Sequence, residues 1–159
     1  MHRALPVGTH AFGRRCLLAT AVAAILPGCA NQSTVVLTPS RPSASSTMTI
    51  TAPERGRHAF TIHHIDTTAF AGGTMDIEVT VSGESATNAS FDLFPADAVI
   101  PTDGRSTISL ATAYDVSKGQ TVHLSYTFTR GEIFPFGGEG NWFSPPGSKG
   151  TVQYKVTVR

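Results

Sequence analysis

The residues best placed to form a contact site lie in one glycine- and aromatic-rich segment, residues 133–146. It holds three phenylalanines and the chain's one tryptophan among glycines and prolines. Such rings on a loop can stack on sugars or anchor a protein partner. We therefore predict a ligand- or partner-binding patch made of Phe134, Phe136, Glu139, Asn141, Trp142 and Phe143. The competing interpretation, favoured by the need of so many rings for burial, is that the segment folds back and caps the core.

Four histidines invite a metal-site interpretation: His58, His63, His64 and His123. If residues 58–65 form a strand, His63 and His64 point to opposite faces, which is poor geometry for binding one ion. His123 falls on the polar face of another expected strand, and no further ligands follow at zinc-like spacing. We predict neither a metal site nor a cofactor, and we expect these histidines at the surface or the edge of the core.

Catalytic patterns are no stronger than the metal pattern. The serines are numerous, but none lies in a Gly-x-Ser-x-Gly turn. Asp92, Asp97 and Asp103 are close in sequence, yet they fall in an expected turn region, where aspartate favours local backbone hydrogen bonds. Their carboxylate oxygens leave a calcium loop open, although the irregular spacing of the three residues argues against one. We predict a non-enzymatic protein, with a small hydrolase as the less favoured alternative.

Cys29 could undergo a different chemistry, covalent attachment to lipid. Arg14 and Arg15 precede an uncharged apolar run, residues 17–26, and Gly28 lies just before the cysteine. A basic leader followed by a short apolar run is the layout of an export signal. The run has about ten residues, whereas a membrane-spanning helix needs roughly 20. The end of this leader, Leu26-Pro27-Gly28-Cys29, resembles a bacterial lipoprotein signal.

That resemblance implies removal of residues 1–28 and attachment of fatty acyl chains such as palmitate to Cys29. The membrane would then be a partner through this lipid, and the protein would belong to the cell envelope. Ala30 after the cysteine resembles the signal for the periplasmic side of the outer membrane in a host with two membranes; otherwise the outer face of the cell membrane is implied. Arg14-Arg15 also resembles a twin-arginine leader, so both export routes stay open.

Removal of the leader changes the charge of the chain. Without its three arginines, nine basic residues remain against eleven acidic ones, a net charge of −2. No basic patch remains for nucleic acid, so we expect no such partner. Residues 29–47, the lipidated cysteine and a Ser-, Thr- and Pro-rich stretch, are expected to form a flexible tether.

From residue 48 to residue 159 the dominant hydrophobic period is two. Successive strand residues point to opposite faces, so each such segment would have one apolar and one polar face. Turn signals separate the segments, and no amphipathic helix is visible. The pattern predicts one all-β domain, an immunoglobulin-like antiparallel β-sandwich of about seven strands. The expected strands are 48–51, 58–65, 74–82, 90–94, 105–111, 121–128 and 152–158.

The order of these strands carries a second resemblance. Phe91-Asp92-Leu93, Asp103-Gly104-Arg105 and Lys118-Gly119-Gln120-Thr121 punctuate them as in the secreted bacterial immunoglobulin-like domains of unassigned function. The resemblance covers residues 57–159, and the insertion at 131–148 departs from that group's pattern. It implies a fold and an extracytoplasmic location but no catalytic residues. We expect a binding or scaffolding module with an envelope protein or glycan as partner; the alternative is an inhibitor of a cell-wall hydrolase or a toxin.

Overall fold

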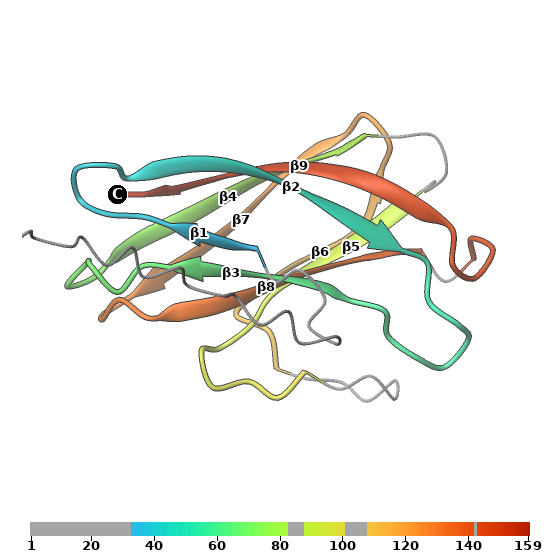
Figure 1. The fold of residues 1–159 in the computed structure, drawn as a ribbon, viewed down its shortest axis with the longest axis horizontal. Coiled ribbons are helices and arrows are strands. Elements are labelled where there is room, and N and C mark those ends of the chain that lie inside the picture. The colour runs from blue at the N-terminus through green and yellow to red at the C-terminus, as the bar shows by residue number, and fades with distance from the viewer. Residues whose placement is uncertain (1–32, 83–87, 101–107, 142) are drawn as a thin grey trace, which may run out of the picture.

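The chain forms two β-sheets that pack face to face (Figure 1). The computed structural model describes residues 33–82, 88–100, 108–141 and 143–159. The predicted signal peptide, Cys29 and Trp142 lie outside these residues. Within them no helix is long and apolar enough to cross a membrane. The strands are β1 (Thr34–Val36), β2 (Ser43–Thr51), β3 (Thr61–Asp66), β4 (Gly73–Ser82), β5 (Asn88–Leu93), β6 (Ala111–Ser117), β7 (Thr121–Phe128), β8 (Ile133–Gly140) and β9 (Lys149–Val158).

One sheet has five strands in the order β1-β3-β8-β5-β6, and the other has four in the order β2-β9-β4-β7. All neighbouring strands are antiparallel except β1 and β3, which are parallel. The described part of the chain is therefore all-β in two layers, which confirms the predicted class and architecture at that level.

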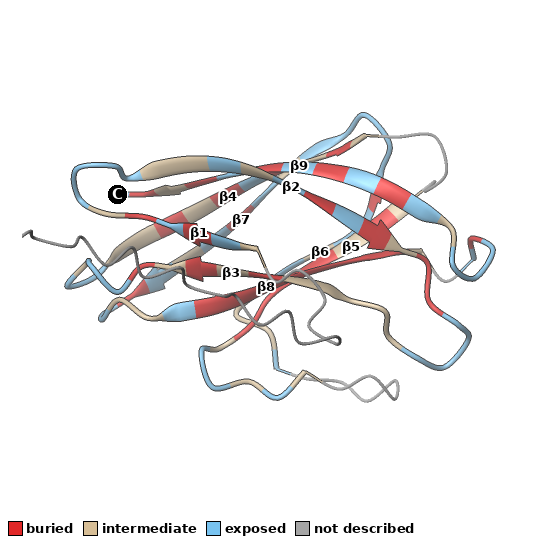
Figure 2. Cartoon of the chain, viewed as in Figure 1, coloured by how far each residue is buried: buried red, intermediate tan, exposed pale blue. Residues whose placement is uncertain are grey.

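The core lies between the two sheets and is built by alternation along the strands. On β4, Met75, Ile77 and Val79 are fully buried, while the residues between them face outward. The same alternation runs along β9, where buried and exposed residues follow each other along the ribbon in Figure 2. These two strands occupy the centre of the four-stranded sheet, so their apolar faces form the middle of the core.

The structure corrects the prediction of a tether. Of residues 29–47, positions 33–47 are described, and they include β1 and the first half of β2. Val35 and Leu37 are buried in the core, and Ala44 packs against it. The Ser- and Thr-rich composition suggested disorder because the outward residues of β2 are hydroxyl side chains, and its fully buried apolar residues, Met48 and Ile50, come only in its second half.

The strand count was also wrong: the described residues form nine strands, where about seven were expected. The two additional strands are β1 and β8. The strand expected at 105–111 is displaced, since β6 begins only at Ala111. Residues 101–107, which contain the first part of that expected strand, lie outside the described residues.

Candidate functional site

The segment predicted to be a contact loop is largely a strand, β8, in the middle of the five-stranded sheet. Phe134 and Phe136 are 3% and 0% exposed and belong to the core cluster between the sheets. Both rings face inward, so they cannot form part of a contact patch on the surface. The competing interpretation, in which aromatic rings of this segment fill the core, holds for these two residues.

The glycines of β8 are needed because this strand is covered on both faces. A Cβ on Gly137 would lie 2.9 Å from Phe94 Cε2 and 3.0 Å from Ile62 Cδ1, on the outer face of the sheet. A Cβ on Gly138 would lie 2.7 Å from Met48 Sδ, on the inner face. Phe60 and Phe94 meet edge to face above the outer surface, with ring centroids 5.5 Å apart. This second apolar layer surrounds the acidic residues described next.

Glu139 projects from β8 on this outer face and is almost fully buried, with 3% of the residue exposed. Its Oε1 lies 3.0 Å from His58 Nδ1, and its Oε2 accepts a hydrogen bond of 3.0 Å from the Ala59 backbone N–H. The His58 ring in turn stacks on Phe60 at 5.0 Å. Because both carboxylate oxygens bind residues of one loop, Glu139 fastens the loop between β2 and β3 to the sheet.

Asp92 supplies a second buried carboxyl group on the same face. It lies on β5 opposite Gly137 and is 5% exposed, and its Oδ1 accepts a hydrogen bond of 2.8 Å from Ser109 Oγ. Burial raises the pKa of the Asp92 carboxyl, and the nearby charge of Glu139 adds to that rise. The Ser109 hydrogen bond and the charge of His58 act in the opposite direction. Asp92 therefore holds the chain near Ser109 to the sheet, as Glu139 holds the other loop.

The exposed part of the predicted patch is the turn after β8. The Phe143 side chain is 98% exposed. Its backbone N–H donates to Asn141 Oδ1 at 2.7 Å, and the Ser144 N–H donates to the Asn141 carbonyl at 3.0 Å. The Asn141 N–H is itself bound to the Asn88 carbonyl at 2.8 Å, which ties the turn to β5. The geometry thus presents an aromatic ring to solvent from a braced backbone.

Tyr114 adds a second exposed aromatic ring at the same end of the molecule. It is 66% exposed on β6, and the next residue, Asp115, accepts a 3.5 Å hydrogen bond from Asn141 Nδ2. The structure therefore keeps Asn141 and Phe143 of the predicted patch at the surface and moves Phe134 and Phe136 into the core. It places Glu139 in a buried bracing role. Trp142 lies outside the described residues.

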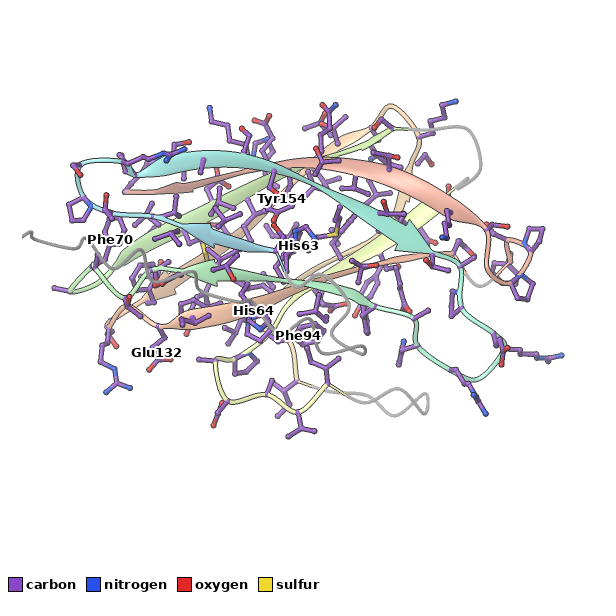
Figure 3. All side chains as sticks on the ribbon, viewed as in Figure 1. His63, His64, Phe70, Phe94, Glu132 and Tyr154 are labelled. Atoms are coloured by element: carbon purple, nitrogen blue, oxygen red, sulfur yellow. The ribbon has the colours of Figure 1, made fainter. Side chains whose placement is uncertain are left out.

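The histidines do not gather at one place. His63 is buried between the sheets, and its Nδ1 lies 2.7 Å from the Tyr154 hydroxyl; Figure 3 shows the two side chains pointing toward each other. Burial lowers the pKa of His63, and the neighbouring His64 lowers it further. His123 lies on the polar face, 3.5 Å from Asp76 Oδ1. In the described ranges, no three histidine, cysteine or acidic side chains are grouped so as to hold a metal ion.

Sequence reasoning missed the contacts of Glu139 and of Asp92. Asp92 lies within β5, as the expected strand 90–94 predicted, and not in the turn region to which it was also assigned. His58 and Glu139 are 81 positions apart, and no local pattern links them. One signal was available: Glu139 is the one charged residue in a long stretch of glycine, proline and aromatic residues. A charge in such surroundings is buried only with partners.

Comparison with known proteins adds evidence about the fold. No protein-family profile matches the chain, and no curated protein is detectably similar to it. Among solved structures, one match is CorA, a surface-associated copper-binding protein of Methylomicrobium album BG8. It has 10% identity and a TM-score of 0.50 over 80% of this chain and 98% of that one. Another is PliG of Aeromonas hydrophila, a periplasmic inhibitor of g-type lysozyme, with 18% identity and a TM-score of 0.49 over 80% and 96% of the two chains.

The similarity to CorA concerns architecture only. At 10% identity the likeness to CorA concerns the two-sheet fold, and the likeness to PliG is too loose to support an argument. The class is a two-layer β-sandwich, and its function has to be argued from its own residues.

Proposed function

We propose that this protein is a lipid-anchored envelope lipoprotein whose sandwich is a non-catalytic binding module for an envelope protein. The anchor would be acylated Cys29, and the sandwich would belong with the secreted immunoglobulin-like domains that its strand order resembles. The contact surface, called here the Phe143 turn, consists of Asn141 and Phe143 together with Tyr114 of β6.

The observation that carries this proposal is the exposure of Phe143 on a braced turn. A ring that is 98% exposed can bury a large apolar area when a partner binds, and its backbone is already fixed by the hydrogen bonds of Asn141. Aromatic anchors of this kind commonly dominate the energy of an interface. Protein rather than glycan is favoured because the buried acids beside the turn are engaged in bracing loops and do not face outward to bind sugar hydroxyls.

The same bracing argues against a hydrolase. Both oxygens of Glu139 are bound to the loop containing His58 and Ala59, and Asp92 is bound to Ser109. An acid and a base for hydrolysis would have to reach a substrate, whereas these groups hold the cover of the sheet in place.

Capture from an envelope extract tests the proposal. The full chain is immobilised and compared with Phe143→Ala and with Val36→Ala, which removes an exposed apolar side chain on β1. Phe143→Ala should weaken capture of a defined protein by about 30-fold, the loss expected for a hot-spot residue, with unchanged circular dichroism. Val36→Ala should capture as the parent does. Equal capture by all three proteins would overturn the assignment of the Phe143 turn.

The inhibitor hypothesis is a special case of the same contact. The glycines of residues 133–146 do not form a projecting loop that could enter an active-site cleft, because Gly137, Gly138 and Gly140 lie within β8 and are buried. A captured cell-wall hydrolase that loses activity on binding, and regains it with Phe143→Ala, would identify an inhibitor. A captured protein that keeps its activity would identify a scaffold.

A further inference from the structure

The outermost strands of the two sheets are not equally protected against pairing with another strand. An open strand edge presents unpaired N–H and C=O groups, and proteins block such edges by shortness, bulges, charges or proline. β1 has three residues. β6 has an irregular register opposite Ala89–Phe91 and a positive φ of 56° at Asp115. β7 carries His123, which lies beside the acidic Asp76.

β2 has none of these protections. Its nine residues contain no charge and no proline, and all nine pair with β9 without a register shift. It is the outermost strand of the four-stranded sheet, as Figure 1 also shows. The outward side chains Ser45, Thr47 and Thr49 are exposed. Among the described strands, β2 is therefore a long, regularly paired and uncharged edge.

The hydrogen bonds show which backbone groups of β2 point away from β9. In an antiparallel pair, alternate residues direct both backbone groups to the same neighbour. The Pro42 carbonyl accepts from Val158 N–H, and the Ala52 N–H donates to the Ser148 carbonyl, so even-numbered residues face β9. The Thr49 carbonyl instead accepts from Thr61 Oγ1 at 2.6 Å, across the gap toward β3. Ser45 and Thr47 accordingly direct their N–H and C=O groups outward.

Among the described residues, the second half of this edge has open space beside it. A groove of about 570 Å³ follows β2 from Thr47 to Thr51 and is bordered on its other side by Thr61 and His63 of β3. Lys149 lies at one end of the groove, next to Thr51. The groove brings the outward backbone groups within reach of an added strand.

We propose that β2 pairs antiparallel with β2 of a second copy of this chain, joining two four-stranded sheets across a two-fold axis near Thr47. A two-fold contact uses the same surface twice, so that surface must complement itself. β2 meets this condition because its outward residues are all small hydroxyl side chains, which pair favourably across strands. Antiparallel pairing about Thr47 also puts the two Lys149 residues roughly 25 Å apart, so like charges do not meet.

Sedimentation equilibrium of the full chain, in detergent matched to the solvent density, tests this interface. The test variant is Thr47→Pro. Proline removes the N–H of residue 47, which points away from β9, so the hydrogen bonds between β2 and β9 remain, while each chain loses one hydrogen bond to the other chain of the dimer. The matched control is Ser125→Pro, at an outward position of β7, the opposite edge of the same sheet. The parent and Ser125→Pro should be dimers. Because Thr47→Pro removes two hydrogen bonds from the interface, it should raise the dimer dissociation constant about tenfold or more.

A second variant covers the case in which Thr47→Pro fails to fold. Thr47→Lys keeps the backbone N–H but places two positive charges opposite each other near the axis, and it should also give a monomer. A parent that is monomeric throughout the micromolar range would overturn the proposal. So would a dimer that survives both substitutions at Thr47. Neither result depends on the Phe143 turn, which lies outside β2.

Discussion

Removing the Glu139 side chain is the perturbation that tests the bracing of the sheet cover most sharply. In Glu139→Ala, the Ala59 N–H and His58 Nδ1 lose partners that now lie at 3.0 Å. Hydrogen bonds to a charged group contribute about 1.5 to 3 kcal/mol each, and removal of a buried carboxylate recovers part of its desolvation cost. We expect Glu139→Ala to lower the free energy of unfolding by about 2 to 4 kcal/mol.

Two further variants separate this bracing from a general effect of charge. Glu139→Gln keeps a carbonyl to accept from Ala59 and an amide that can face His58, so it should cost only about 1 kcal/mol. Glu78→Ala removes a half-exposed glutamate from the other sheet and should change stability by less than about 0.5 kcal/mol. Urea unfolding followed by circular dichroism gives the three values.

Amide hydrogen exchange at Ala59 adds a local readout, because the loop should open more readily in Glu139→Ala than in Glu139→Gln. The bracing role would be refuted if Glu139→Ala cost no more than Glu78→Ala and left exchange at Ala59 unchanged.

Three other predictions concern packing and titration. Gly131→Ala should destabilise by about 3 kcal/mol or more in thermal unfolding, because its Cβ would overlap the Thr67 backbone carbonyl oxygen, which no rotamer change relieves. Gly119→Ala, with open space around it and only a φ of +81° to strain it, should cost about 1 kcal/mol in that assay. Burial raises the pKa of Asp92 in the folded chain, so the free energy of unfolding should fall as the pH rises from about 4 through that folded-state pKa. Asp92→Asn should remove this fall. If the parent and Asp92→Asn show the same dependence of stability on pH, the raised pKa of Asp92 is contradicted. Tyr154→Phe should cost about 1 to 3 kcal/mol by leaving the buried His63 Nδ1 without the hydroxyl, and a neutral result would show that the 2.7 Å contact contributes nothing.

The strands that the sequence predicts best are those with one apolar and one polar face. β4, β7 and β9 were expected close to their observed bounds, because apolar and polar residues alternate visibly along a strand wherever one face of its sheet is exposed to solvent. β8 was missed for the opposite reason. It is covered by the core on one face and by Phe60 and Phe94 on the other, so its residues do not alternate, and its glycines are required by close packing.

The candidate site could be predicted only in part. The exposed Phe143 and the half-buried Asn141 belong to the patch that composition indicated, but the rest of the site depends on contacts between distant parts of the chain. Asp115, which follows the exposed Tyr114, is linked to the Phe143 turn by a hydrogen bond from Asn141. The bracing acids act on loops that precede or follow them by many residues. Hydrophobic periodicity carries no information about such pairs. Lipidation of Cys29 and the role of Trp142 stay predictions.

Photocrosslinking in intact cells tests the central claim most directly. A benzophenone amino acid replaces Phe143 in one full-length chain and Val36 in another, since both positions are exposed. The account predicts one discrete protein adduct from position 143 in the envelope fraction and none of that mass from position 36. The absence of an adduct at 143, or the same adducts from both positions, would contradict it.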